Sequence, residues 1–488
     1  MSITTALNNA LTGLNATSRK TEVVSDNIAN ALTPGYSRRE VEVSAQVVAG
    51  AGRGVSVDGV RLVQNVGLTT SRWRSDAQLG AQSTTLDGLE RLEAAIGLPG
   101  DGGALASRAA AFESALLSAS NDPSSPAALG VTKQAAEQYA GSISLLSTET
   151  QRIRMDTDAT IARQVATVNS NLQSIERLNQ EIRLRTFAGG DAAALIDQRK
   201  ALIDQITSII PIRTSNREAG SVALYTTGGA ALLESSAMTL EFDATPIITQ
   251  DMTIGSGALS GISINGQDID IGVPADPGLL DGGSLGALFG LRDYTMPDMA
   301  DALDALAEDL VNRFQDPGVD PTLAVGDAGL FTDNGAAYDG VSREGLAGRL
   351  EPNAAVDPDQ GGALWRLRDG MNAAAQGPAG DASILSALYD VAIETRAADP
   401  ALGIASGGGV AALAAGFTER VGAERQAAET EQGYLAAVNT GLRESESAAT
   451  GVSTDVELQR LLLLEQAYAA NARVISAADG MMRSLLEI

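Results

Sequence analysis

The amino-acid sequence predicts a mainly helical α+β fold in which the two ends of the chain pair as a coiled coil. Small and apolar residues recur every three or four residues at both termini, and this is the spacing of a coiled-coil seam. A much longer helical pattern follows the first, and a run of short β-rich segments separates two helical blocks. We therefore expect five parts, namely an axial helix (1–35), a helical middle domain with a strand region (36–210), an inserted small all-β outer domain (211–280), the return half of the middle domain (281–449) and a last axial helix that pairs with the first (450–488).

The two terminal seams are poor in large side chains. The first comprises Ile3, Leu7, Ala10, Leu14, Thr17, Thr21, Val24, Ile28 and Ala31. The second comprises Leu461, Leu464, Tyr468, Asn471, Ile475, Ala478, Met482 and Leu485, and Arg460 is expected on the outer side of that helix. Such helices are marginal when isolated, so we expect packing on each other and on further copies of the chain to stabilise them.

The first helix is expected to end near residue 31, before Pro34 and Gly35. Proline disfavours helix in the preceding residue, and glycine supplies a turn. Alternating valines between residues 41 and 62 then predict strands. Helical patterns resume at 68–96 and 104–120.

The longest helix is expected from about residue 126 to residue 186, as a rod packed on a neighbouring helix. A further helix should span 192–209, before the texture changes to short β-rich runs that are expected to form an outward appendage. Helices are expected again at 284–314, 383–396 and 410–446, whereas the Pro-, Gly- and Asp-rich segment 316–381 gives no ordered prediction.

Composition excludes several classes of function. The chain has no cysteine and no histidine, which removes disulfides, Cys/His zinc sites and every Ser-His-Asp or Cys-His arrangement. The net charge of −27 argues against nucleic acid and against an anionic membrane as partners. No stretch approaches the ~20 apolar residues of a membrane helix, and the first residues lack a signal-peptide pattern.

Carboxylates are the remaining candidates for chemistry. Asp301, Asp304, Glu308 and Asp309 line one side of an expected helix, where paired acids could bind a metal or act as acid and base. Leucines occupy the opposite side, so we expect a solvated face instead. None of the glycine-rich pieces has the spacing of a phosphate-binding loop, so no cofactor or metal is expected.

Specific residues at both ends carry a family resemblance. The stretch 25–30 (SDNIAN), followed by TPGYSR at 33–38, resembles the N-terminal signature of bacterial flagellar rod, hook and hook-associated proteins. At the other end, GVSTD at 451–455 and EQAYAAN at 465–471 are similar to the C-terminal signature of that family. A long helical block directly after the strand region resembles the hook-associated members at the junction between hook and filament. Leu32 and the stretch 481–483 depart from the usual pattern without disturbing the seam.

The resemblance implies a non-enzymatic structural subunit that joins hook to filament by self-assembly through its terminal helices. It implies export through the flagellar type III route to the cell exterior. The implied partners are further copies of the chain, the hook protein, hook-associated protein 3 and an export chaperone, with no nucleic acid, membrane or cofactor. Asn27 and Asn30 would hold the end of the first helix, and Tyr36 would anchor the turn. The full set of expected interface residues is Leu7, Leu14, Val24, Asn27, Ile28, Asn30, Pro34, Gly35, Tyr36, Leu461, Leu464, Tyr468, Ile475, Met482 and Leu485.

Two alternatives stay open at this point. One is a hook or distal rod subunit of the same family. The other is a carboxylate-based hydrolase carried at the flagellar tip, with its active acids between residues 316 and 381. Metal content and hydrolase activity would separate the second alternative from a structural protein.

Overall fold

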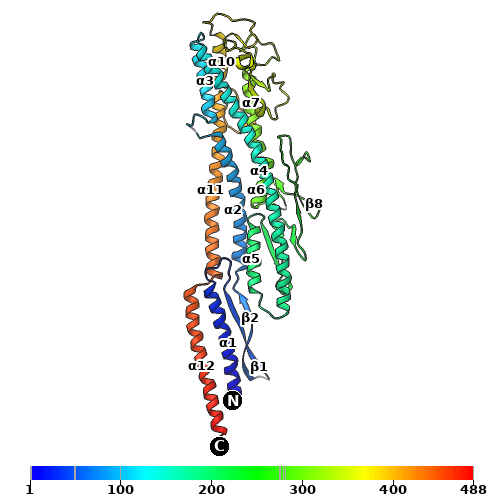
Figure 1. The fold of residues 1–488 in the computed structure, drawn as a ribbon, viewed down its shortest axis with the longest axis vertical. Coiled ribbons are helices and arrows are strands. Elements are labelled where there is room, and N and C mark those ends of the chain that lie inside the picture. Colours follow the sequence, from blue (N-terminus) through cyan, green and yellow to red (C-terminus); the bar gives the residue numbers. More distant parts are fainter. Residues whose placement is uncertain are drawn as a thin grey trace.

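The structure, a computed structural model, describes residues 3–48, 51–98, 100–273, 276–278, 280 and 282–486. The molecule is elongated, and its long helices run along the long axis (Figure 1). The first helix begins and the last helix ends at the same end of the molecule (Figure 1). In the described ranges, no helix is both long enough and apolar enough to cross a membrane.

The lower end in Figure 1 is formed by four elements, which we call the terminal body: α1 (Ile3–Ala29), β1 (Arg39–Val48), β2 (Ala51–Leu62) and α12 (Thr454–Leu486). Helices α1 and α12 lie side by side, and the hairpin packs on α1. The strands are antiparallel, with Arg39 opposite Leu62, and the register shifts twice along the hairpin. The alternating valines thus predicted the strands correctly.

The remainder of the chain, from α2 to α11, forms what we call the middle block. Helix α2 (Val66–Ile96) packs along α11 (Val410–Thr450), while α3 (Leu105–Asn121) and α5 (Ala193–Thr207) lie against α4 (Pro126–Phe187). Helix α4 has 62 residues. The Ser125 hydroxyl caps it by accepting a hydrogen bond from the Ala128 amide, and Pro126 occupies its first turn. The expected long rod is therefore confirmed.

The β-rich segment forms three small antiparallel sheets. Their strands are β3 (Ile212–Asn216), β4 (Val222–Thr226) and β5 (Ala231–Leu233), then β6 (Leu240–Glu241), β7 (Ile262–Ile264) and β8 (Gln267–Ile269), then β9 (Gly272–Val273) and β10 (Asp276–Pro277), with a 3-10 turn η1 at Glu218–Gly220.

These strands do not enclose a core of their own, as the expected all-β appendage would. Leu224, Leu240 and Ile262 are buried in one cluster with Val168 and Leu172 of α4. Strands of two to five residues have too little surface to bury each other, so they cover the helix instead. The segment is an insertion in sequence, but its apolar residues belong to the core of the middle block.

The return half begins with α6 (Gly283–Gly290), which continues through a π-helical turn η2 (Leu291–Thr295) into α7 (Met296–Phe314). The segment 316–381, for which no elements were predicted, contains short elements and is followed by α10 (Ser383–Ile393). These elements are β11 (Phe331–Asp333) paired with β12 (Leu350–Pro352), α8 (Leu346–Arg349), α9 (Arg366–Asp369), and the 3-10 turns η3 (Ala354–Val356), η4 (Pro358–Gln360) and, after α10, η5 (Pro400–Leu402).

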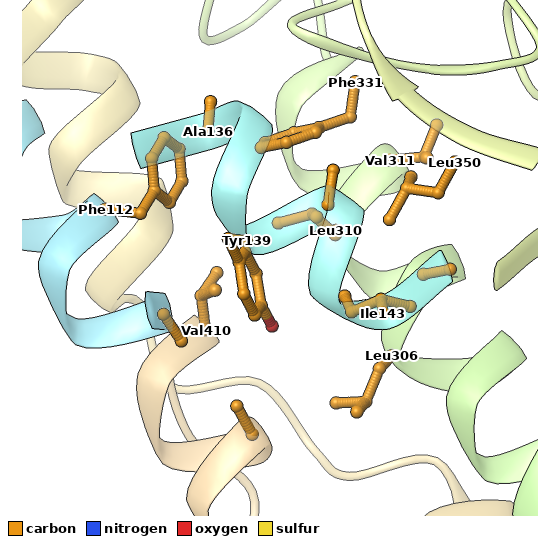
Figure 2. Close-up of a cluster of buried hydrophobic side chains, with 14 of the residues drawn as sticks. Phe112, Ala136, Tyr139, Ile143, Leu306, Leu310, Val311, Phe331, Leu350 and Val410 are labelled. Carbon is orange, nitrogen blue, oxygen red and sulfur yellow. The ribbon is translucent and has the colours of Figure 1, made fainter. Parts of the chain in front are cut away.

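The segment is ordered because its apolar residues enter the largest core. Figure 2 shows Phe331 beside Phe112 of α3 and Tyr139 of α4. The ring centroids of Phe112 and Phe331 are 5.5 Å apart, and those of Phe314 and Phe331 are 5.3 Å apart, in edge-on geometry. A few aromatic rings, placed far apart in the sequence, therefore join four elements.

Candidate assembly interface

The paired terminal helices contact each other mostly through small or half-buried side chains. On α1, Val24 is buried, while Leu7, Leu14 and Ile28 are half-buried. On α12, Ala478 is 1% exposed, and Leu461, Leu464 and Ile475 are half-buried. A pairing that leaves its leucines half-covered contributes little burial per turn.

One close approach explains the small residues on this line. A Cβ atom placed on Gly13 would lie 3.1 Å from both polar side-chain atoms of Asn471. A side chain at residue 13 would require Asn471 to shift, so glycine favours the close approach of α1 to α12 at this level.

Two residues expected in the seam of the last helix are exposed in the single chain. Tyr468 is 48% and Met482 is 42% exposed, whereas Leu485 lies in the last turn of α12, where no side chain is described. A straight helix with 3.6 residues per turn drifts away from a seam that repeats every 3.5 residues. The expected positions therefore leave the α1 side at intervals along α12.

The end of α1 is held by the side chain of Asn27, which is fully buried. Its carbonyl oxygen accepts hydrogen bonds from the Tyr36 hydroxyl and the Arg39 amide, both at 3.0 Å. Its amide group donates to the Arg39 carbonyl at 2.9 Å and to the Glu457 carboxylate of α12 at 3.1 Å. One side chain thus joins the first helix, the turn, the first strand and the last helix.

The neighbouring turn residues have smaller roles. Asn30 donates from its side chain to the Asp26 carbonyl at 2.9 Å, which satisfies a carbonyl at the end of the helix. Pro34 and Gly35 are exposed, and Gly35 has a φ of +80°, a conformation that favours glycine. The Arg39 guanidinium lies 4.7 Å from the centre of the Tyr36 ring. Burial raises the pKa of the Tyr36 hydroxyl, against the opposing effect of Arg39.

Glu457 and Arg460 make contacts between α12 and the rest of the terminal body that the sequence analysis missed. Glu457 is fully buried and also accepts from Arg460 at 3.0 Å, and Arg460 pairs with Glu40 of β1 at 3.2 Å. Arg460 therefore faces the hairpin, and its expected outward position is wrong. The sequence could have predicted the position of Glu457, because residue 457 lies four residues before Leu461 and so extends the seam of α12 by one step.

A second apolar stripe runs along α12 beside the covered seam. Its residues recur at steps of four, three, four and seven and are all exposed: Leu463, Ala467, Ala470, Val474 and Met481. Leu463 is 64%, Met481 50% and Val474 45% exposed. We call this set the open stripe. At its upper end lies a groove of about 330 Å³ between the hairpin and the two helices, lined by Lys20, Val23, Val24, Arg39, Glu40, Val41, Arg460, Leu463 and Leu464.

The acidic face of α7, expected to be solvated, is solvated only in part: Asp301 is exposed, Glu308 and Asp309 are half-buried, and Asp304 is covered. Asp304 is fully buried and accepts hydrogen bonds from the amides of Gly345 and Ala347, both at 2.8 Å, and from Gln250 at 2.6 Å. Burial raises the pKa of this carboxyl, and the three hydrogen bonds oppose the rise. Segment 316–381 covers this side of the helix, so the acid anchors that segment.

The acids within segment 316–381 are used in the same way. Asp316 accepts from the Gly318 amide, Asp327 accepts from the Ala324 amide, and the buried Asp320 accepts from the Met371 amide. Acids that accept from nearby backbone amides commonly stabilise turns. Among the described residues, no three Asp or Glu side chains come close enough together to hold a metal ion.

Comparison with known families gives three matches along the chain. The model of the flagellar hook-associated protein FlgK helical domain matches residues 89–327. The flagella basal body rod protein model matches residues 7–36, and the flagellar basal body rod FlgEFG protein C-terminal model matches residues 447–488. The two end matches coincide with α1 and α12, and the first match includes both α4 and the β-rich segment.

Several individual relatives are flagellar hook-associated protein 1 of other bacteria. The flagellar hook-associated protein 1 of Bacillus subtilis (strain 168) is 23% identical, over 98% of this chain and 97% of that protein. Its namesakes in Salmonella typhimurium and Escherichia coli (strain K12) are 24% and 22% identical, over 63% and 66% of this chain but only 55% and 58% of their own lengths. The solved flagellar hook junction protein FlgK from Burkholderia pseudomallei is 18% identical, with a TM-score of 0.43 over 54% of this chain and 46% of that chain.

Proposed function

We propose that this chain, which matches the model of the FlgK helical domain and is similar to flagellar hook-associated protein 1 of Bacillus subtilis, is a structural flagellar protein of that kind and assembles through its terminal body into the junction between hook and filament. The proposal gives the chain no catalytic role. The long helical match over residues 89–327 favours this role over that of a hook or distal rod subunit, because the rod models match only the two ends.

The open stripe of α12 is the observation that carries the proposal. One apolar line of this helix is covered by α1, and a second, with the same heptad spacing, faces solvent in the single chain. Contiguous exposed apolar residues on a soluble protein usually mark an interaction site. A helix with two adjacent apolar lines suits a bundle of more than two helices, so we infer that a terminal helix of another copy covers the open stripe.

The remaining partners follow from the family. We propose that the hook protein lies on one side of the assembled zone and hook-associated protein 3 on the other. We also propose that an export chaperone accompanies the chain, and that it leaves the cell by the flagellar type III route without cleavage.

A pair of matched substitutions on α12 tests assembly. Val474→Asp places a charge on the open stripe, and Ser476→Asp places the same charge on the polar side, at an exposed position. A carboxylate buried without a partner costs several kcal/mol, so Val474→Asp should abolish filament attachment. Both purified variants should keep the helical signal and melting temperature of the unmodified chain.

The readouts are swimming, filament subunits in the medium, and the amount of exported variant. We expect Val474→Asp cells to export the variant, to shed filament subunits and to lose motility, while Ser476→Asp cells swim. Equal behaviour of the two variants, or normal motility with Val474→Asp, would refute assembly through the open stripe.

A further inference from the structure

No continuous helix joins the terminal body to the middle block in the described part of the chain. Two short linkers, residues 63–65 and 451–453, carry the chain across the join between the two. Among the described residues, neither α1 nor α12 packs along α2 or α11. The two bodies are therefore not held together by a continuous helix–helix interface.

Three hollows surround this join. One of about 680 Å³ lies between β2 and the α4–α5 loop, and one of about 660 Å³ lies between the end of α11 and the start of α12. A smaller cavity of about 150 Å³ lies between Ser37, the 63–66 linker and helix α5. Hollows on three sides of the join leave room for the bodies to change their relative angle.

Polar contacts take the place of apolar packing across the join. The Arg38 amide donates to the Thr450 carbonyl at 2.9 Å, and the Val63 amide donates to the Arg38 carbonyl at 2.8 Å. The Arg39 guanidinium meets the Asp197 carboxylate of α5 at 3.4 Å, with both side chains mostly buried. Arg39 is itself fixed in the terminal body by both backbone bonds to Asn27.

These contacts are incompletely satisfied. The Nε atoms of Arg38 and Arg39 are buried without a hydrogen-bond partner, whereas the Asp197 carboxylate is also hydrogen-bonded by Ser37 of the terminal body. Buried polar atoms are nearly always paired in a settled structure, and each unpaired group requires an explanation. A join that adopts more than one angle explains the unpaired arginine Nε–H groups, because these donors can find acceptors at a second angle.

We propose that this join is a hinge, and that the Arg39–Asp197 ion pair is the latch that holds the single chain at one angle. Gly451 marks the pivot at the end of α11. A Cβ atom there would lie 2.5 Å from the Ser447 carbonyl, so only glycine lets the chain turn this closely off the helix. The inference concerns the motion of one chain and does not depend on what that chain assembles with.

Distances between spin labels test the hinge directly, because the chain contains no native cysteine. Labels on Ala437→Cys of α11 and Gln466→Cys of α12, both exposed, report the angle between the bodies. Labels on Ala437→Cys and Ala166→Cys, both within the middle block, serve as the reference pair. The latch is opened by Asp197→Asn or, independently, by Arg39→Gln, which keeps the backbone bonds to Asn27.

We expect one narrow distance across the join in the unmodified chain and at least a twofold broader distribution in either latch variant. The reference pair should stay unchanged. The distance distribution across the join should also stay unchanged in Glu181→Gln, a control that removes an exposed charge from the nearby part of α4. A distribution that stays narrow in both latch variants would overturn the hinge. A distance distribution that is already broad in the unmodified chain would show that the Arg39–Asp197 pair does not hold one angle.

Discussion

The middle block buries leucine, isoleucine and phenylalanine side chains in two large clusters, whereas no apolar side chain larger than valine is buried in the described part of the terminal body. The buried apolar residues of the terminal body are Ala10, Ala16, Val23, Val24 and Ala478. Burying a large apolar side chain contributes about 1.5–3 kcal/mol, and an alanine contributes much less. Apolar burial within one chain therefore stabilises the middle block far more than it stabilises the terminal body.

The difference shows which contacts stabilise each region. The middle block closes its own cores, and even the Gly- and Pro-rich segment 316–381 is fixed there by Phe331 and by amides that donate to Asp304. The terminal body depends on one polar hub around Asn27 and leaves an apolar stripe uncovered. On the proposed function, assembly supplies the burial that the single chain lacks.

The largest effect is expected from replacing residues 212–273 with a short Gly/Ser linker. The strands cover Val165, Val168, Leu172 and Ile175 of α4, so their removal exposes several large side chains at about 1.5–3 kcal/mol each. That total rivals the ~5–15 kcal/mol stability of a typical domain. We expect aggregation or loss of cooperative melting in calorimetry.

The control for that experiment replaces only residues 254–257, an exposed stretch, with the same linker. It should melt as the unmodified chain does. A cooperative, fully helical protein after the large replacement would show that the β-rich segment is a separable appendage after all.

A smaller, local effect is expected from Asn27→Ala. The change removes the Asn27 bond to one oxygen of the buried Glu457 carboxylate, whose other oxygen keeps Arg460, and removes both Asn27 bonds to the Arg39 backbone, at a local cost of about 2–4 kcal/mol. Hydrogen exchange should quicken at the end of α1 and the start of β1, with little change in the melting of the middle block. Asn30→Ala, which loses two exposed bonds, one to the Asp26 carbonyl and one from the Thr33 hydroxyl, should have a much weaker effect. Equal exchange in the two variants would argue against the Asn27 hub.

The smallest effect is the pH dependence from Asp304. Its pKa in the folded chain is raised above the ordinary value of 3.8, so the folded state binds the proton more tightly than the unfolded state does. Its contribution to stability is therefore present at low pH and declines as pH rises through the raised pKa. The stability difference between the unmodified chain and Asp304→Asn, measured by melting, should shrink from pH 3 to pH 6. A difference that grows over this range would contradict the assignment.

Much of the helical layout was predictable, because long periodic segments with caps and breakers leave few alternatives. Helix α4 ends within a residue or two of its prediction, as a Ser-Pro start and a Gly-Gly end suggest. The two matching seams also predicted that the chain ends lie side by side, as α1 and α12 do, whereas their coiled-coil geometry stays a prediction. The five domain boundaries and the interface roles of the seam residues stay predictions.

The errors share one physical cause, which is that sequence pattern does not reveal what covers a given face. Asp304 has the pattern of a solvated position, but a loop far along the chain covers it. Arg460 was predicted to face outward, but Glu40 of β1 lies against it and pairs with it. The β-rich segment looked separable because nothing in its alternation shows that its inner face lies on α4.

Hydrogen exchange, measured on the monomer and on assembled protein, tests most directly the central claim that the terminal body gains its order on assembly. In the monomer, amides at the free ends of α1 and α12, farthest from the Asn27 hub, should exchange rapidly while the middle block is protected. In the assembled state both ends should become protected, with little change in the middle block. Strong protection of both ends in the monomer, unchanged on assembly, would contradict this account.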